Sequence, residues 1–353
     1  MLTTSQSRHI LECAVRAPSA DNHHRFWLEF ADDGLYLWSR DSEITTLRGY
    51  KRSLMLLSLG AAAENIVIGA SRVGIQAEIS PLPNDMTEDP VCKVRWLRAD
   101  EQVELDPLEN AIAERHTNRK FYHGPPLASE HLARLEDAAE MVGCRLIWLD
   151  TRQLRRKVLR LIRSAETARF SNRHLHAELF SAIRFDIGWR KSCLEGLPPG
   201  TLEVEAPLRP VFKMMRHWPV MRRLNLLGTH YLLGHRAAWL PCALAPHLGL
   251  VATSAGSDAQ TFTAGRALER VWLQATQLGL ALQPMPASIL YSQGDGGSAT
   301  ITTRFSGRLR DAWKELLPNA VPQMLFRLGH AAKPSILSGR VAADHLLKNG
   351  SGI

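Results

Sequence analysis

Two stretches of this sequence decide the fold: residues 59–78 are LGAAAENIVIGASRVGIQAE, and residues 264–283 are AGRALERVWLQATQLGLALQ. They align at a constant offset of 205 residues. Five aligned pairs are identical: Gly60/Gly265, Ala62/Ala267, Glu64/Glu269, Ala70/Ala275 and Gly74/Gly279. In the second stretch apolar residues recur at steps of four and three, which predicts one buried helix face. The last glycine of each stretch stands where a helix commonly ends in the left-handed conformation. Each stretch therefore predicts a long helix followed by an extended segment.

A shorter pair of segments supports an internal duplication. Residues 9–17 (HILECAVRA) resemble residues 133–141 (ARLEDAAEM) at an offset of 124 residues. Each precedes a strand-like run, FWLEF at residues 26–30 and RLIWL at residues 145–149. The order helix, strand, long helix, strand thus occurs twice. Because the two offsets differ by 81 residues, the second half should carry an insertion of about that length.

Residues 151–248 fit that insertion. They begin with a basic helical stretch, TRQLRRKVLRLIRSAETARF, and end in a segment rich in Met, Trp, Leu and Arg that Pro219 and Gly228 interrupt. Three interpretations stay open, in falling order of preference: ordinary packed helices, a lid over a site, and a helix lying on a membrane surface. We therefore expect a first lobe at residues 1–110 and a second at residues 111–353, with this helical insertion in the second.

The composition is that of a globular protein. Of the 353 residues, 45% are apolar and 22% are charged, which excludes a largely disordered chain. We expect neither a spanning helix nor a signal peptide, because no run of 18 apolar residues is free of charge and no basic N-terminal segment precedes an apolar run. Five single cysteines argue against a disulfide framework and favour the cytoplasm. The net charge of +8 leaves nucleic acid, an anionic membrane and a phosphorylated small molecule as partners to weigh against a surface with surplus arginine.

The first candidate site segment is APSADNHHRF at residues 17–26. Pro18 should end the preceding helix. Ser19 and Asn22 then supply short polar side chains in a turn. Taken alone, the segment is equally typical of an ordinary loop that ends a helix.

The second candidate segment is ERHTNRKFY at residues 114–122. Arg115, Thr117 and Arg119 alternate, so an extended backbone would point all three side chains the same way. Two guanidinium groups that flank a hydroxyl form a cradle for an anion. Taken alone, this segment is equally typical of a solvated basic loop.

Together, APSxxN, xRHTxR and the duplicated Ala- and Gly-rich helix resemble the FMN-dependent nitroreductase superfamily. Further matches are GLVATSAG at residues 249–256, GRALERVWLQATQLGLALQPM at residues 265–285 and QMLFRLGHAAKPSILSGR at residues 323–340. The sequence looks most like the two-lobed, Acg-like branch, in which one chain imitates the usual homodimer. The resemblance implies a nitroreductase-like α+β fold of two lobes, each a small, mainly antiparallel sheet wrapped by helices, packed as an intrachain pseudo-dimer.

The same resemblance implies an FMN site between the lobes. The residues implied at the phosphate and ribityl end are Arg115, Thr117 and Arg119 of the second lobe. Pro18, Ser19 and Asn22 of the first lobe would replace the partner subunit's contacts with FMN. Arg340, in a C-terminal arm, matches the position of another phosphate-binding basic residue. The backbone around Pro284 and Met285 would face the flavin edge near N5. Paired arginines suit a flavin phosphate, which carries nearly two charges. No catalytic side chain is implied, because the flavin carries the hydride chemistry.

The two lobes differ in the parts of this site that they carry. The first has the APSxxN turn but no arginine cradle ahead of it, whereas the second has the cradle but continues from its matching helix into EMVGCRL. We therefore expect one FMN per chain. The turn departs from the family pattern, with Ala20 where a second serine is common and His24-Arg25 where Gln-Pro is common. These departures put the flavin contacts from the first lobe in doubt.

Three other signals do not predict sites. QGDGGSA at residues 293–299 lacks both GxGxxG and the P-loop ending. The histidine pairs HHR at residues 23–25 and HLH at residues 174–176 lack carboxylate or cysteine partners at a convincing spacing, so we expect no metal. The run RRKVLRLIR lacks the interleaved aromatic residues of a single-strand nucleic-acid surface, so we expect no nucleic-acid partner.

The favoured function is an FMN-dependent oxidoreductase that takes electrons from NAD(P)H and passes them to a nitroaromatic, quinone or similar flat acceptor by a ping-pong route. The alternative is a protein that sequesters FMN under a closed lid with little or no turnover. A third interpretation is a biosynthetic protein whose flavin acts on a peptide or lipid-like substrate docked on the insertion. The expected partners are NAD(P)H and a small-molecule acceptor. Membrane contact through the insertion is the least favoured, and self-association beyond the monomeric pseudo-dimer is left open.

Overall fold

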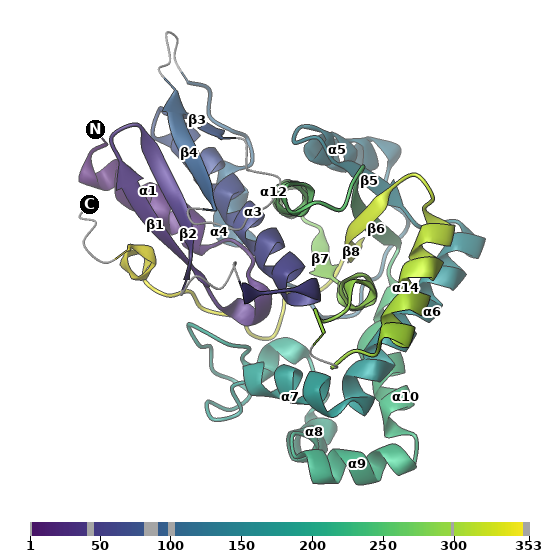
Figure 1. The fold of residues 1–353 in the computed structure, drawn as a ribbon. Helices are drawn as coiled ribbons and strands as arrows, with labels where there is room; N and C mark the ends of the chain where they lie inside the picture. Colours follow the sequence, from purple (N-terminus) through teal and green to yellow (C-terminus); the bar gives the residue numbers. More distant parts are fainter. Residues whose placement is uncertain (1, 41–45, 81–90, 98–102, 298–299, 349–353) are drawn as a thin grey trace.

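The computed structural model describes residues 2–40, 46–80, 91–97, 103–297 and 300–348 (Figure 1). The N-terminal elements are α1 (Thr4–Val15), η1 (Ala20–Asn22), β1 (Phe26–Ala31), β2 (Gly34–Ser39), α3 (Gly49–Arg72), β3 (Gln76–Ile79) and β4 (Cys92–Leu97). They are followed by α4 (Glu109–Glu114), α5 (Ser129–Glu140) and β5 (Arg145–Trp148). The C-terminal elements are β6 (His247–Thr253), α12 (Asp258–Gln277), β7 (Ala281–Pro284), α13 (Ala287–Leu290), η6 (Tyr291–Gln293), α14 (Thr303–Leu316), β8 (Val321–Gly329) and η7 (Ala343–Leu346).

Two antiparallel sheets of four strands have the same strand order. The first is β1-β2-β4-β3 and the second is β5-β6-β8-β7. The expected α+β class with two lobes is therefore confirmed. Each sheet has a long helix of its own, α3 with the first core cluster and α12 with the second. Gly74 and Gly279, just beyond these helices, have φ of 75° and 69°, which confirms the predicted left-handed ends.

The two long helices pack against each other where they cross, and the contact is symmetric. A Cβ added at Gly60 would overlap the carbonyl oxygen of Phe262, and one added at Gly265 would overlap the carbonyl oxygen of Leu57. Only glycine allows the two backbones to come this close. By length and hydropathy α3 resembles a membrane span, yet 78% of its most apolar window is buried inside the structure. In this structure it is the core helix of the first lobe.

The chain leaves the second sheet after β5 and returns to it at β6. Between them lie α6 (Arg152–Ser171), α7 (Arg173–Ala182), η3 (Pro199–Leu202), η4 (Ala206–Leu208), α8 (Arg209–Met215), α9 (Trp218–Leu226), α10 (Thr229–Gly234), the π-helical turn η5 (His235–Trp239) and α11 (Leu240–Leu244). In the first lobe, β1 and β2 are joined by a tight turn at residues 32–33. The insertion therefore occupies the place of a hairpin turn, and its helices α7–α10 lie below both sheets in Figure 1.

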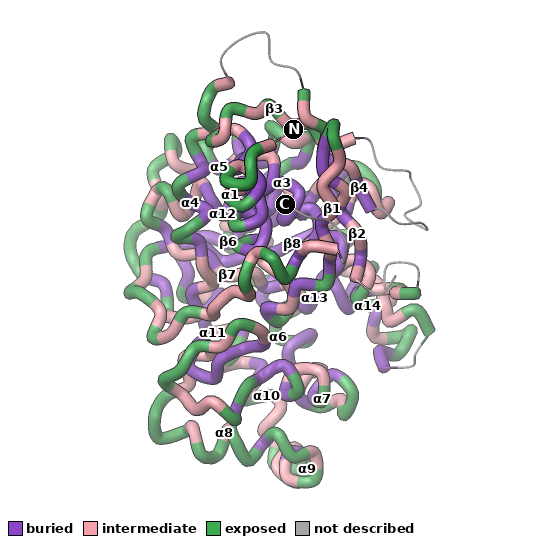
Figure 2. The backbone as a smooth tube through the Cα atoms, turned by 90° about the vertical axis from the view of Figure 1, so that its left-hand side faces the viewer, coloured by how far each residue is buried: buried purple, intermediate pink, exposed green. Residues whose placement is uncertain are grey.

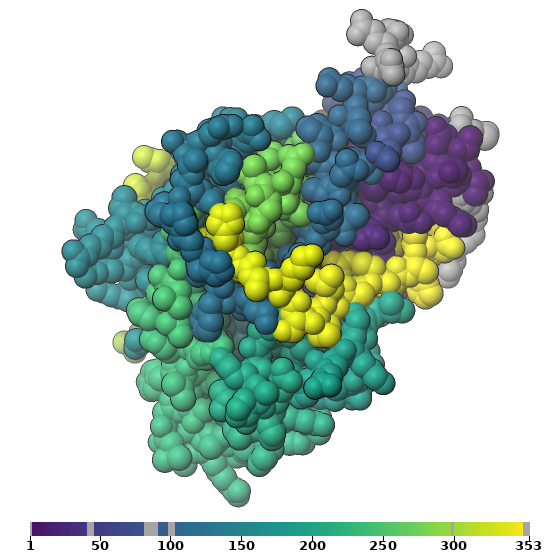
Figure 3. All heavy atoms as spheres, turned by 180° about the vertical axis from the view of Figure 1, so that it is seen from behind, coloured from purple at the N-terminus to yellow at the C-terminus, as the bar shows by residue number. Residues whose placement is uncertain are grey.

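The C-terminal arm, residues 330–348, crosses from the second lobe to the first. Leu346 is buried in the core of the first lobe, and Leu347 forms a parallel bridge to Leu28 of β1. Figure 3 shows this arm in yellow, running across the back of the molecule to the purple first lobe and bordering the teal insertion. The crossed helices join the two lobes in the interior, and the arm joins them across the back of the molecule.

Candidate functional site

The turn between α1 and β1 holds the first-lobe residues of the predicted site. Helix α1 ends at Val15, three residues before Pro18. Asp21 and Asn22 then adopt positive φ of 53° and 60°, which aspartate and asparagine tolerate better than other residues with a side chain. Pro18 and Ser19 are half-buried in this turn, whereas Asn22 is buried. The turn thus fixes Asn22 pointing inward.

Asn22 joins three distant segments of the chain. Its Oδ1 accepts a hydrogen bond from Arg340 Nη1 at 2.7 Å, and its Nδ2 donates to the carbonyl oxygens of Leu194 at 3.0 Å and Gly339 at 3.3 Å. Arg340 belongs to the C-terminal arm and Leu194 to the insertion. The structure therefore brings together two predicted site residues, Asn22 and Arg340, through direct contact.

Arg115 lies at the end of α4 and faces α12. Its Nε is 3.2 Å from Glu269 Oε1, and its Nη2 donates to the carbonyl oxygen of Arg16 at 2.6 Å. The guanidinium carbon lies 4.5 Å from the ring centre of Trp272. Both charged side chains of the pair are almost fully buried, at 2% and 0% exposure. No sequence pattern indicates Glu269 as the partner of Arg115, although Glu269 is one of the identical residues in the duplicated helices.

Positive charge exceeds negative charge around these residues. Burial lowers the pKa of Arg340 to about 10, and the charges of Arg115 and Arg16 lower it as well, against the Glu269 carboxylate. Burial raises the pKa of Glu269 to about 7, although Arg115 opposes that shift. Three buried donors, Arg340 Nε, Ser19 Oγ and Arg115 Nε, have no hydrogen-bond partner among the described residues, and neither do the two carboxylate oxygens of Glu269. We call Ser19, Asn22, Arg115 and Arg340 the arginine site.

The insertion contacts residues 114–122, the segment that contains Arg115. Arg119, half-buried, donates from Nη1 to the carbonyl oxygen of Thr201 at 3.4 Å. Glu203 lies 2.7 Å from Lys120 Nζ, and its carboxylate accepts hydrogen bonds from the amide and the hydroxyl of Ser335. Burial favours a raised pKa for Glu203, but the hydrogen bonds from Lys120 and Ser335 outweigh it and lower the pKa. These contacts connect the insertion to the C-terminal arm and to residues 114–122, which we call the arginine-bearing segment.

The remaining predicted residues lie around this region with different roles. Thr117 is half-buried between Arg115 and Arg119. Pro284 ends β7 opposite Phe326. The Met285 amide donates to the carbonyl oxygen of Leu325 at 2.7 Å, and its side chain belongs to a core cluster of the second lobe. The Met285 N–H is therefore bonded to the neighbouring strand, and the expectation that the backbone around Pro284 and Met285 faces the flavin edge stays a prediction.

Arg327 is a second residue of this region that was not among the predicted site residues. It lies on β8 with 0% exposure, donates to Gln283 Oε1 and to the carbonyl oxygen of Lys120, and stacks 3.8 Å from the ring centre of Tyr122. Burial lowers its pKa. The charge within the apolar run MLFRLG was the sequence signal for it. Arg327 anchors the arginine-bearing segment against the second sheet.

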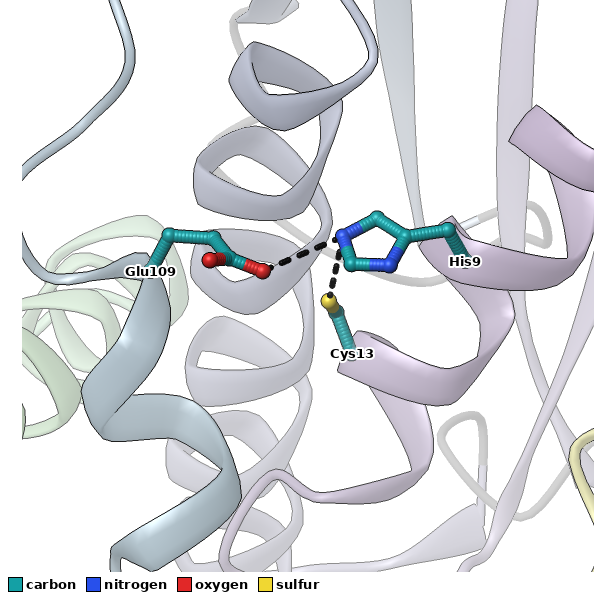
Figure 4. A group of neighbouring side chains, drawn as sticks. All are labelled: His9, Cys13 and Glu109. Carbon is teal, nitrogen blue, oxygen red and sulfur yellow. Dashed lines mark hydrogen bonds and ion pairs between the residues drawn. The ribbon is translucent and has the colours of Figure 1, made fainter.

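Three potential metal ligands meet outside this site, between α1 and α4 (Figure 4). His9 Nε2 lies 3.2 Å from Glu109 Oε1 and 3.5 Å from Cys13 Sγ, and Arg72 lies 3.4 Å from the other carboxylate oxygen. Burial and the nearby Glu109 raise the pKa of Cys13 to about 12, so the thiol stays protonated at neutral pH. Since these contacts already pair the three side chains, we assign the group to the packing of α1 against α4.

Comparison with known proteins gives distant similarities. No protein-family model matches the chain. An uncharacterized protein of Mycobacterium tuberculosis (strain CDC 1551 / Oshkosh) is 24% identical over 343 residues, which are 95% of this chain and 47% of that protein. The chain thus spans about half the length of the curated relative that it matches.

Among solved structures, a nitroreductase with bound FMN from Bacteroides fragilis is 13% identical, with 70% of this chain and 98% of that chain covered and a TM-score of 0.37. The FMN-dependent nitroreductase NfnB of Mycobacterium smegmatis, in complex with NADPH, is 15% identical, with 63% and 86% covered and a TM-score of 0.33. A nitroreductase with bound FMN from Desulfitobacterium hafniense is 17% identical, with 67% and 94% covered and a TM-score of 0.31.

Proposed function

We propose that this chain is an FMN-dependent oxidoreductase of the nitroreductase superfamily. It takes electrons from NAD(P)H and passes them to a nitroaromatic, a quinone or a similar flat acceptor by a ping-pong route. The observation that best supports this proposal is the arginine site. There, the buried arginines Arg115 and Arg340 lie near one buried carboxylate, that of Glu269, and the first lobe adds the polar side chains of Ser19 and Asn22.

The residues of the arginine site fit the phosphate of FMN. Arg340 Nε and Ser19 Oγ are buried donors without an acceptor in the described part of the chain, and phosphate oxygens are strong acceptors. An anion between Arg115 and Arg340 would also offset the repulsion that lowers the pKa of Arg340. When bound, FMN supplies the hydride chemistry of the reaction.

Each protein residue then has a role in binding. Arg340 and Ser19 bind the phosphate, Asn22 holds the Arg340 guanidinium in place through its Oδ1, and Arg115 adds positive charge. Glu269 positions Arg115 and competes with the phosphate for its charge. The insertion, through Leu194 and Thr201, excludes water from the same region.

Binding of FMN and of riboflavin, which lacks the phosphate, tests this assignment. Arg340→Gln should weaken FMN binding about ten- to a hundred-fold, since a charge-assisted hydrogen bond contributes roughly 1.5–3 kcal/mol. Riboflavin binding should change little. The matched control is Arg184→Gln, because Arg184 is exposed and pairs only locally with Asp186. Equal losses for FMN and riboflavin, or equal losses in the control, would contradict a phosphate role for Arg340.

Sequestration of FMN remains a second candidate function, and the closure of the insertion favours it. Asn22, Arg119 and Lys120 all contact residues of the insertion. If the insertion stays closed, NAD(P)H cannot reach the flavin. Anaerobic mixing with NADPH separates the two candidates. Fast bleaching of the flavin absorbance supports the oxidoreductase, whereas bound flavin that resists NADPH supports sequestration.

A further inference from the structure

The far end of the insertion lacks acidic residues altogether. Between Glu205 and Asp258 the sequence contains no Asp or Glu over 52 residues. Residues 209–236 of this stretch contain six basic residues: Arg209, Lys213, Arg216, Arg222, Arg223 and Arg236. Arg236 pairs with Glu205, and Arg209 donates to the carbonyl oxygen of Val204. The other four basic side chains are exposed.

The same segment concentrates exposed apolar side chains. Seven of the fourteen large hydrophobic residues exposed in the described part of the chain lie within residues 208–232: Leu208, Val211, Met214, Leu226, Leu227, Tyr231 and Leu232. Leu226 and Leu227 are the most exposed of all, at 86% and 85%. Clusters of exposed apolar residues commonly mark an interaction site. We call residues 208–232 the basic-apolar tip.

The tip presents its charges and its apolar groups together. Arg222 precedes Leu226 by four residues, so the two lie on one side of α9, and Leu227 follows directly after the helix ends. The inner side of the tip is anchored instead by Met215 and Met221, which are buried with Phe180 and Phe185. Figures 1 and 2 show α8 and α9 at the end of the molecule that lies farthest from the two sheets. The outward leucines and arginines are therefore available to a partner.

We propose that the basic-apolar tip docks on an anionic lipid surface. Leucine side chains at the end of a helix bury apolar area at the boundary between headgroups and acyl chains, and neighbouring Lys and Arg are attracted to anionic headgroups. A symmetric contact between two copies of the tip would bring the exposed cations of both copies together, and residues 206–257 contain no carboxylate to pair with them. A second copy is therefore a less suitable partner than an anionic surface. This proposal is independent of the FMN site, which lies in other segments.

Co-sedimentation of the full chain with lipid vesicles tests the proposal. The chain should bind phosphatidylcholine vesicles that contain about one third phosphatidylserine, and bind vesicles of pure phosphatidylcholine much more weakly. Leu226→Ser with Leu227→Ser should weaken binding to anionic vesicles at least about tenfold, because two exposed apolar groups are lost. Arg222→Gln with Arg223→Gln should weaken it several-fold, and raised salt should do the same to the unaltered chain.

Two matched controls separate the tip from the rest of the surface. Met141→Ser removes an apolar side chain that is 71% exposed elsewhere, and Arg160→Gln with Arg163→Gln removes two exposed charges from α6. Both should leave vesicle binding within about twofold of the unaltered chain. Failure to bind anionic vesicles would overturn the proposal. Binding that the leucine variant leaves unchanged would also overturn it, in favour of a purely electrostatic contact. Self-association that this variant abolishes, without vesicle binding, would identify a second copy as the partner.

Discussion

Arg115 has two roles, one in the proposed binding of FMN and one in folding. It is predicted to add positive charge at the FMN phosphate, and it also neutralises Glu269, which is fully buried. Removing one member of a buried ion pair leaves the other charged in a medium of low polarity, which is costly. Arg115→Ala is therefore a test of folding before it is a test of binding, and Arg340 is the better residue for the binding test.

Arg115→Ala should lower the free energy of unfolding by up to about 3–5 kcal/mol. Glu269 loses the partner that lowers its pKa, so it must be buried as an unpaired carboxylate or take up a proton. Arg115→Met combined with Glu269→Leu should recover most of that loss, since both charges are removed at similar volume. Urea denaturation followed by circular dichroism measures both values. The control is Arg134→Ala, which removes an exposed pair with Glu130 and should cost less than about 0.5 kcal/mol. A double variant as unstable as the single one would contradict the account of the pair.

The affinity for FMN should fall as pH rises through about 10. In the free protein the pKa of Arg340 is lowered to about 10, so above that pH the guanidinium loses the charge that binds the phosphate. Below about pH 9 Arg340 is protonated and its contribution is fully present. Titrations of FMN and riboflavin from neutral pH to about pH 10.5 measure this difference, because the two ligands share the same ring. A ratio of the two affinities that does not change with pH would show that Arg340 is not the titrating contact.

At the scale of elements, the crossing of α3 and α12 determines how the two lobes meet. The close approach needs glycine at residues 60 and 265, which the duplicated sequence already marked. Glu64 adds a charged link across the crossing, because its carboxylate pairs with Arg266 and Arg270 of α12, each at 2.7 Å. Backbone packing and ion pairs therefore hold the two helices together in the same region of the crossing.

Gly60→Ala and Gly265→Ala should each lower the free energy of unfolding by roughly 1–3 kcal/mol or more, because a Cβ at either position overlaps a backbone carbonyl. Gly307→Ala is the matched control, since Gly307 lies within α14 with nothing inside 4 Å of an added Cβ. It should stabilise the fold by roughly 0.5–1 kcal/mol through the helix preference of alanine. Thermal or urea unfolding of the three variants gives the answer. Equal changes in the free energy of unfolding for the Gly60 and Gly307 variants would mean that α3 and α12 can move apart at little cost.

Local patterns predicted the elements better than the contacts between them. The long helices, their glycine ends and the end of α1 before Pro18 follow from short-range periodicity and backbone preferences. The pairing of Arg115 with Glu269 depends on segments far apart in the sequence, and so does the burial of Arg327. The hydrogen bond of the Met285 amide depends on the register of β7 against β8, which no local pattern specifies. Asn22 and Arg340, which the structure brings into contact, stay predicted site residues, and no local pattern indicated what holds Arg115.

At the scale of the whole molecule, the two sheets are equivalent but the segments around them are not. Ten residues, 16–25, separate α1 from β1, whereas only residues 141–144 separate α5 from β5. The second lobe thus has no room for a turn like that around Asn22. Only the first lobe has the turn, and only the second supplies the segment with Arg115 and the arm with Arg340. This asymmetry supports one site per chain, and the division of the chain at residues 110 and 111 stays a prediction.

Glu203→Ala should speed the release of FMN roughly tenfold, because Glu203 ties the insertion to both Lys120 and Ser335. Asp186→Ala is the matched control, since Asp186 pairs with Arg184 inside the insertion and should leave release unchanged. The rate of FMN release is measured by stopped-flow flavin fluorescence, after mixing with an excess of another flavoprotein's apoprotein that captures the released FMN. Equal rates in the two variants would show that these contacts do not gate the site.

The central claim is a duplicated fold that keeps a single cofactor site. Release of the chromophore from the purified or FMN-saturated protein, quantified by visible absorption against protein concentration, tests it most directly. The account predicts about one FMN per chain. Two FMN per chain would mean that both lobes form complete sites, and a protein that stays colourless with added FMN would contradict the cofactor assignment altogether.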